Sequence, residues 1–428
     1  MTPPSLRGRR PGAADLVVAI VLASLALVAR APAPSAGNGP PRTILLRGEA
    51  LLDAKRRLRL GDTTLQAAHA ALLAEADSAL TAGPFTVTSK KAVPPSGDMH
   101  DYMSLAPYWW PDSSKPNGLP YVRHDGRVNP ESRLDNDGAR FGSMVRAVDA
   151  LALAYYLSDN PRFADRAATL VRAWFVSSDT RMNPNLRFGQ AVRGVNDGRG
   201  AGIVSTRGIA RVVDAVRLID GSPAWTSADR EAFTAWCRAF LQWLLTSENG
   251  REERAAKNNH GSWYDVQVAA LALFVGDSAI ARHALGESAR HRIASQILAD
   301  GREPLELART RSLSYSLFNL EALGELAEMA RFTDVDLWHY TAPSGASIRT
   351  ALRFLAPYAV ASARWPGEQV TPVSPAELLL TLRRAATVYD DAVMTEAIGV
   401  LASGHQTDRS ALLYSPVVRS RHARTKTL

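Results

Sequence analysis

The sequence predicts an all-α protein, arranged as a toroid of antiparallel helix hairpins around one central cleft. Apolar residues recur every three to four positions from about 65 to 402, the period of a helix that buries one face. Turn and capping clusters interrupt this pattern, and the two-residue alternation of β-strands is nearly absent. Helix pairs repeated this often form a solenoid or a toroid, and the lack of a fixed-period repeat favours the closed toroid.

The expected helices can be placed in order along the chain. Turn clusters at 158–161, 221–227 and 276–278 are typical of the end of one helix and the start of the next. This punctuation predicts hairpins. The apolar stripes lie within residues 145–156, 167–175, 209–219, 233–244 and 266–274, and similar segments follow near 316–331, 347–360, 375–388 and 390–402.

The start of the chain predicts export. Arginines precede an uncharged apolar run over 16–29, and small residues follow over 31–37, which is the pattern of a secretory signal. The run is too short for a comfortable membrane span, and an uncleaved N-terminal anchor is the alternative. We expect a periplasmic or secreted protein with no membrane span in the mature domain. The expected parts are a signal peptide or anchor over 1–36, a linker over 37–60, the toroid domain over 61–405, and a basic, flexible tail over 406–428.

The composition fits a globular enzyme that acts on an acidic substrate. Hydrophobic residues make up 46% of the chain and charged residues 21%, with a formal net charge of +8. The basic residues are scattered through the helical patterns and no nucleic-acid motif is visible, so we expect no nucleic-acid partner. Cys237 is the single cysteine, which excludes an internal disulfide. Its apolar helical surroundings predict a small buried residue and not a catalytic thiol.

Two long segments break the helical pattern, and irregular segments of this length in a compact domain are usually functional. The first contains Tyr108, Trp109 and Trp110, whose flat rings could stack on pyranose sugars or anchor the loop onto the helices. The second contains Asn196 and Arg199 in a glycine-rich loop, where they could bind substrate oxygens or form a turn. The two segments are residues 92–136 and 183–206.

Two short motifs carry the expected chemistry. Asn258-Asn259-His260-Gly261 supplies two amides and an imidazole, and Arg309-x-Arg311-x-x-x-Tyr315 supplies guanidinium groups and a phenol. These side chains are the ones needed to hold a sugar carboxylate and to move a proton beside it. The chain shows no paired histidines and carboxylates at metal-ligand spacing, so we expect neither a metal nor another cofactor.

Five segments occur in the order found in one known family. They are His100 to Asp112, Asn196-Asp197-Gly198-Arg199-Gly200, Ser222-Pro223-Ala224-Trp225, Asn258-Asn259-His260-Gly261 and Arg309-x-Arg311-x-x-x-Tyr315. Together they resemble the alginate lyase family of polysaccharide lyases, over roughly residues 60 to 360. The resemblance implies an incomplete or closed α/α toroid of six or seven hairpins. It also implies cleavage of β-1,4-linked polyuronates, such as alginate, polymannuronate or a glucuronan-like polymer, by β-elimination without a redox cofactor.

The same chemistry can be built from the residues. Removing the C5 proton of a uronate is easier once the adjacent carboxylate is neutralised, and Asn259, His260 and Arg309 are the candidates for that task. Tyr315 could take the C5 proton, protonate the leaving O4, or do both. A syn elimination needs only this tyrosine, whereas in an anti elimination His260 would be the base and Tyr315 the acid.

The remaining candidates have two interpretations each. Glu253 could contact the substrate carboxylate or orient His260 or Arg309, or it could lie in a solvated charged turn. Arg311 could bind substrate or pair with a helix neighbour. Asn258 is a candidate substrate ligand beside its two neighbours.

Two other functions compete with the lyase hypothesis. A noncatalytic polyuronate-binding protein would keep the first irregular segment, residues 92–136, which we call the aromatic loop. It would not need Tyr315. A glycoside hydrolase would need two carboxylates flanking the scissile bond. Its candidates would be Glu131, Asp135, Asp137 and Glu253. An acidic polysaccharide is the expected partner in all three cases.

Overall fold

A computed structural model describes residues 39–414 of the chain, and it confirms the predicted all-helical class. The predicted signal segment and residues 415–428 of the predicted tail lie outside this range. No helix within 39–414 is long and apolar enough to cross a membrane. The main helices are α2 (Gly48–Arg59), α3 (Thr63–Ala79), α4 (Asp137–Ser158), α5 (Pro161–Phe175), α6 (Ile209–Ile219), α7 (Ser227–Thr246), α8 (Glu248–Ala255), α9 (Asn259–Val275), α10 (Ser278–Ser288), α13 (Ser312–Ala330), α14 (Ile348–Ala359), α15 (Leu379–Ala386) and α16 (Ala392–Gly404).

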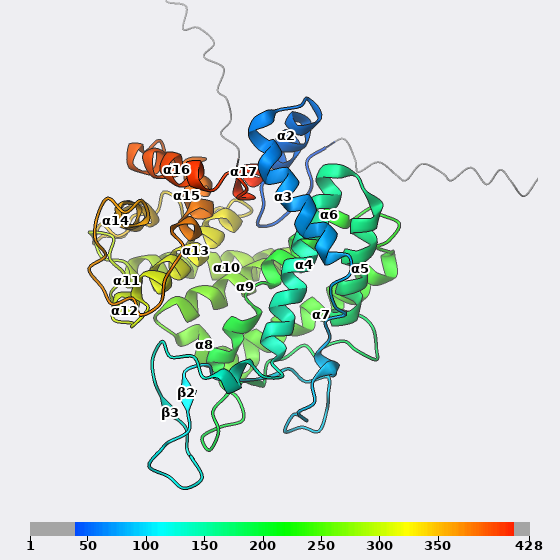
Figure 1. The fold of residues 1–428 in the computed structure, drawn as a ribbon, viewed down its shortest axis with the longest axis vertical. Helices are drawn as coiled ribbons and strands as arrows, with labels where there is room; N and C mark the ends of the chain where they lie inside the picture. The colour runs from blue at the N-terminus through cyan, green and yellow to red at the C-terminus, as the bar shows by residue number, and fades with distance from the viewer. Residues whose placement is uncertain (1–38, 415–428) are drawn as a thin grey trace, which may run out of the picture. The chain divides into compact units, whose positions relative to one another are not determined.

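The helices form an inner and an outer layer (Figure 1). The inner helices α4, α6, α9, α13 and α15 each pack against the next, and α5, α10 and α16 pack outside the inner helix that precedes them. Burial follows this arrangement. Helices α9 and α13 are buried on nearly all sides and are apolar along most of their length, whereas α5 buries only one face. The succession of inner and outer helices is that of an α/α toroid.

Capping residues start the helices where the sequence punctuation places them. Asn160 caps α5, with Pro161 at its first position, and Thr226 and Asp229 form a capping box at α7. Gly276 ends α9 with a φ of 83°, a left-handed conformation that glycine adopts without strain. The predicted hairpin boundaries are therefore confirmed at these turns.

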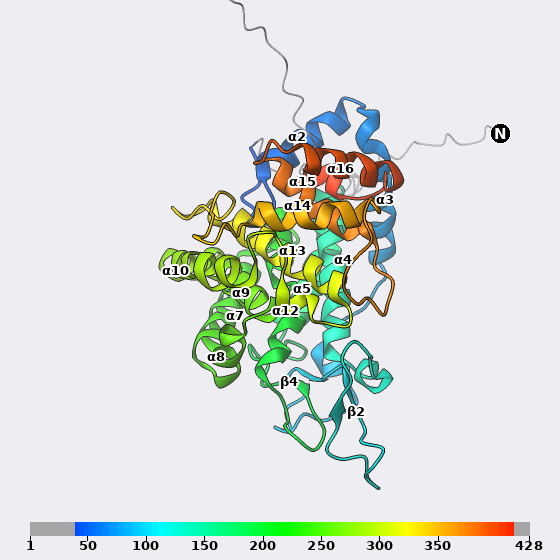
Figure 2. The same ribbon diagram turned by 90° about the vertical axis from the view of Figure 1, so that its left-hand side faces the viewer.

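The two irregular segments lie together at the end of the molecule opposite α2 and α16 (Figures 1 and 2). Each contributes one strand to a short parallel pair, β1 (Met103–Leu105) with β4 (Phe188–Ala191). Within the first segment, β2 (Trp109–Trp110) and β3 (Val122–Arg123) form an antiparallel pair. The second segment continues into the 3₁₀ helix η3 (Gly200–Thr206), which packs on α8. The second segment contacts α9 through η3, and Tyr108 of the first segment is bonded to Tyr315 near the start of α13.

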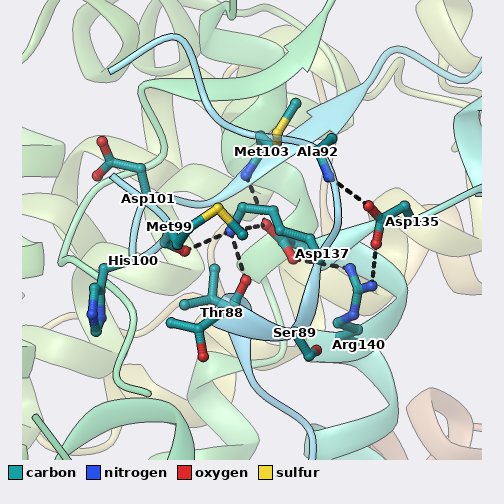
Figure 3. A network of polar contacts seen from close by, with 12 residues as sticks. Thr88, Ser89, Ala92, Met99, His100, Asp101, Met103, Asp135, Asp137 and Arg140 are labelled. Carbon is teal, nitrogen blue, oxygen red and sulfur yellow. Dashed lines mark hydrogen bonds and ion pairs between the residues drawn. The ribbon is translucent and has the colours of Figure 1, made fainter. Parts of the chain in front are cut away.

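A buried ion pair fixes the start of the first segment to α4 (Figure 3). Lys90 Nζ lies 3.1 Å from Asp137 Oδ2 and donates to the carbonyls of Val87 and Met99 at 2.6 and 2.8 Å. Asp137 also accepts from the Met103 amide at 3.0 Å. Burial lowers the pKa of Lys90 and raises that of Asp137, but the two charges oppose these shifts. The aromatic loop is thus attached to a rigid helix end.

The segment predicted as a linker over 37–60 differs from that expectation. It contains α2, and the residues before α2 are buried because Asp214 of α6 accepts hydrogen bonds from their amides. The donors are Ile44, Leu45 and Leu46, the last two at 2.9 and 2.7 Å. The described part of the predicted tail also packs, since α17 (Ser410–Leu413) contacts α2 and α3. The packing of the residues before α2 could not be foreseen, because the carboxylate that binds their amides lies far along the sequence.

The core is filled by aliphatic side chains and a run of edge-to-face aromatic rings. Phe175 is at its centre, with ring centroids 5.1 Å from Phe233 and 4.6 Å from Trp236. Cys237 is fully buried beside them, which confirms its prediction as a small core residue. Burial also raises the pKa of its thiol, so it is an unreactive group.

Candidate active site

His260 is held at the start of inner helix α9 by residues from two elements. Asn258 caps the helix, and its side-chain oxygen accepts from the His260 amide at 3.3 Å. The Glu253 carboxylate of α8 lies 2.7 Å from His260 Nδ1. Glu253 is 2% exposed, so it is not part of a solvated turn. A carboxylate at Nδ1 favours the tautomer with its proton there, which leaves Nε2 free to accept a proton.

The first motif ends in glycine because no side chain fits at position 261. A Cβ at this position would overlap the Ala256 carbonyl and the Arg292 guanidinium. Only glycine therefore allows the turn between α8 and α9 to pass so close to the first turn of α9. This close approach brings Glu253 within reach of His260.

Tyr315 lies in the first turn of inner helix α13, and its hydroxyl is 2.6 Å from the Tyr108 hydroxyl of the aromatic loop. The Arg309 guanidinium lies over the Tyr315 ring, with its Cζ 3.9 Å from the ring centroid. Burial raises the pKa of Tyr315, as does the Tyr108 hydroxyl, and the Arg309 charge opposes the rise. The phenol is therefore protonated at neutral pH.

Arg309 is already paired with a carboxylate of the protein. Its Nη2 lies 2.7 Å from Asp125 Oδ1, and its Nε lies 3.1 Å from Asp125 Oδ2. Burial opposes ionisation of Asp125, but the Arg309 hydrogen bonds and charge lower the Asp125 pKa to about 2. The sequence places Arg309 at the substrate carboxylate. In this structure it contacts Asp125 and the Tyr315 ring.

Asn259 and Glu306 join the two motifs. The Glu306 carboxylate accepts from the Asn259 amide and from its side-chain Nδ2, both at 2.7 Å. Burial raises the pKa of Glu306, while these bonds and the nearby charges of Arg309 and His260 lower it. The carboxylate of Glu306 thus lies between the histidine side and the arginine side of the site. Asn259 is itself 1% exposed, and its two bonds to Glu306 hold it in place.

The aromatic loop and the glycine-rich loop meet beside these residues. The Arg199 guanidinium lies 5.8 Å from the Trp109 ring centroid and donates to the Gln190 side chain at 2.9 Å. Trp109 and Trp110 are half-buried, and the Trp110 ring nitrogen donates to the Arg127 carbonyl at 2.9 Å. Both tryptophans thus hold the loop together. They also keep part of each ring exposed.

Two predicted residues lie apart from the cluster. Asn196 is exposed, and its side-chain oxygen accepts from the Val192 amide at 3.2 Å, so it forms the turn that the sequence left as an alternative. Arg311 precedes α13, and its backbone forms a bridge with Gln369. No ion pair involves Arg311 in the part of the chain that the structure describes. The Arg311 carbonyl accepts from the Tyr315 amide at 3.0 Å, but within residues 39–414 neither the Arg311 nor the Asn196 side chain is hydrogen-bonded to His260 or Tyr315.

The family is decided by a comparison with known sequence families. The alginate lyase family model matches residues 86–365. The chain belongs to the alginate lyase family. The match includes both motifs and both irregular segments, and it confirms the resemblance drawn from the five ordered motifs.

Solved alginate lyase structures share the fold. An alginate lyase from Bacteroides ovatus is 36% identical with a TM-score of 0.83, and the match covers 88% of this chain and 100% of that one. A histidine-to-alanine variant of alginate lyase A1-III in complex with a tetrasaccharide is 17% identical with a TM-score of 0.57, covering 85% and 93%. No curated protein matches the chain. Membership of the alginate lyase family makes the protein a polysaccharide lyase with the toroid fold, and it implies an acidic polysaccharide as substrate.

Asp125 and Glu306 complete the alginate lyase site but were not foreseen. Asp125 lies in a turn after β3 and belongs to no recognisable motif, so only the folded loop brings it to Arg309. Glu306 also belongs to no recognised motif. It lies in the short helix α12 (Pro304–Leu307), which ends before Arg309, so no shared helix face indicates the pairing.

Proposed function

We propose that this enzyme cleaves alginate by β-elimination, with Tyr315 and His260 as the proton-transfer residues. The observation that carries the proposal is the Tyr315 hydroxyl, bonded to Tyr108 and lying beside the Arg309 charge. Its raised pKa keeps the phenol protonated, which is the state needed to donate a proton to the leaving O4. The family supports alginate as the polymer.

The reaction balances within the substrate and these two residues. The C5–H bond breaks and its electron pair forms the C4=C5 double bond, while the C4–O4 bond breaks and O4 receives a proton from Tyr315. In an anti elimination, His260 Nε2 takes the C5 proton, since Glu253 holds Nδ1. In a syn elimination, Tyr315 must first lose its own proton to solvent; the phenolate then takes the C5 proton and passes that proton to O4. The two stereochemistries correspond to the two C5 epimers in alginate.

We assign the neutralisation of the substrate carboxylate to Asn259. The second hydrogen of its Nδ2 can donate to the uronate while Glu306 holds the first. Arg309 contributes through Tyr315, because its charge lies against the ring and favours ionisation of the phenol. Preorganised donors of this kind stabilise the enolate-like transition state.

The hydrolase alternative has less support. Asp135 and Asp137, two of its candidate carboxylates, are bonded to Arg140, and Asp137 is also buried against Lys90. Glu131 accepts from Tyr121 and pairs with Arg193. Each of these carboxylates therefore has a structural partner, whereas hydrolysis needs a carboxylate that is free to protonate the leaving oxygen.

The proposal is tested by following ultraviolet absorbance of unsaturated product on polymannuronate, polyguluronate and glucuronan. Tyr315→Phe removes only the hydroxyl, and we expect loss of activity on every polymer that the wild type cleaves. His260→Ala should abolish cleavage of any polymer that is cleaved by anti elimination. Full activity of Tyr315→Phe would remove Tyr315 from the reaction, and products without absorbance would refute elimination.

Export is part of the same proposal. A long polyuronate does not cross a membrane unaided, so we infer that the enzyme meets it outside the cytoplasm. The predicted signal over 1–36 fits this requirement. N-terminal sequencing of protein secreted by the native host would show a start near residue 37 if the signal is cleaved.

A further inference from the structure

A basic groove lies beside the turn that leads into His260. It has a volume of about 740 Å³ and is lined by residues of α8, the turn between α8 and α9, α9, α10, and the π-helical turn Ala289–Ile293 with the residues just after it. None of its lining residues belongs to the two motifs. The lining includes Arg251, Arg254, Lys257, Asp265, His291 and Arg292.

The floor of this groove is rigid and internally neutralised. Arg292 is 4% exposed, and its Nε donates to Asp265 Oδ2 at 2.8 Å. Its other nitrogens donate to the carbonyls of Ala256 and Arg254, both at 2.9 Å. Every nitrogen of this guanidinium is therefore used to hold the turn between α8 and α9 in place. The floor fixes the positions of the residues above it.

The rim carries positive charge that the protein does not neutralise. Arg251, Arg254 and Lys257 are exposed, and none of them forms an ion pair within residues 39–414. Arg251 and Arg254 are three residues apart on α8, a spacing at which like charges repel. The carboxylate of Glu287, which also lines the groove, is already paired with Arg290 and His291. The rim therefore gains from an anion supplied by a ligand.

We propose that this groove binds a second stretch of the polyuronate chain, outside the active site. The ligand identity rests on the proposed function. A polyuronate presents one carboxylate per sugar, and a guanidinium fork binds a carboxylate through two parallel hydrogen bonds. Two arginines and a lysine along one rim thus match a regular row of carboxylates. A compact anion would use only one of them.

The groove lies next to the active site along α8, so binding there affects catalysis. Glu253 and Arg254 are neighbours on α8, and the first is buried against His260 while the second is exposed on the rim. A polymer held at the rim therefore stays close to the active site between cleavage events. Such tethering raises the local concentration of cleavable bonds without adding contacts to the reacting sugar. It serves long chains and not short oligomers.

The test compares two matched triple variants. The groove variant is Arg251→Ala, Arg254→Ala and Lys257→Ala, and the control variant replaces three exposed cations without ion pairs elsewhere, Arg42→Ala, Arg162→Ala and Arg238→Ala. Steady-state kinetics are measured on long alginate and on a purified short oligomer, at several salt concentrations. Calorimetric titration with long alginate measures binding directly.

For the groove variant we expect the KM on long alginate to rise about tenfold, because three exposed ion pairs are lost. Its salt dependence should weaken, while kcat and the kinetics on the short oligomer match the control. A KM on long alginate equal to that of the control would overturn the groove proposal.

Failure of the proposed function has a different signature. It would appear as a wild type that releases no unsaturated product, and the titration would then test the groove alone. Weaker alginate binding by the groove variant than by the control would uphold the groove, and equal binding would overturn it.

Discussion

Removal of the Glu253 carboxylate tests whether His260 must be oriented to react. The bond to His260 Nδ1 is 2.7 Å long, and the Glu253 side chain is 3% exposed. A buried hydrogen bond to a charged group contributes about 1.5–3 kcal/mol, and its loss corresponds to roughly a 10- to 150-fold lower rate. We expect Glu253→Ala to lower kcat by a factor in this range on a polymer that is cleaved by anti elimination. KM should change little, because the Glu253 side chain is buried and bonded to His260.

The matched variant is Glu253→Gln, which keeps an acceptor for Nδ1–H and loses only the charge. Its kcat should fall about fivefold, the difference between a charged and a neutral hydrogen bond of about 1 kcal/mol. Initial rates from product absorbance give both constants, and thermal unfolding checks that the variants are folded. Equal kcat for wild type and Glu253→Ala, or a change confined to KM, would refute the orienting role.

Three further predictions concern residues that the sequence did not single out. Asp125→Ala frees Arg309 from its partner. We expect kcat/KM to fall about tenfold, because one charged hydrogen-bond pair is lost. Unchanged rates would show that Asp125 does not position Arg309. Glu306→Ala should lower kcat about tenfold or more, since Asn259 loses both of its bonds, and Glu306→Gln should recover part of the loss; equal rates for the two variants would contradict this. Burial raises the Asp214 pKa from 3.8 to about 6, so folding favours its protonated form. Wild-type stability relative to Asp214→Asn should therefore fall as pH rises from about 4 to about 6, by about 3 kcal/mol at most in denaturant unfolding; a pH-independent difference would show that Asp214 keeps an ordinary pKa.

The helical class and the cluster around His260 and Tyr315 were accessible from the sequence because each rests on local information. Apolar spacing and capping residues marked the hairpins, and the two motifs are continuous in the chain. Glu253 was a candidate from the sequence; its burial excludes the solvated turn, and its bond to His260 supports the orienting role.

The remaining features depend on contacts between distant parts of the chain. Asp125 meets Arg309 only when the aromatic loop folds over α13, and the loop itself is fixed by the buried pair of Lys90 and Asp137. The packing of the N-terminal segment depends on Asp214, about 170 residues further along the chain. No local pattern carries such information, because these partners share neither a helix face nor a motif.

The central claim is that the enzyme breaks the glycosidic bond by elimination, with Tyr315 as the proton donor. Mass spectrometry of the products from alginate tests it most directly, with the wild type and Tyr315→Phe compared under identical conditions. The account predicts oligosaccharides whose new ends lack one water relative to hydrolysis products, and no such products from the variant. Hydrated, saturated ends, or unsaturated ends formed equally well by Tyr315→Phe, would contradict it.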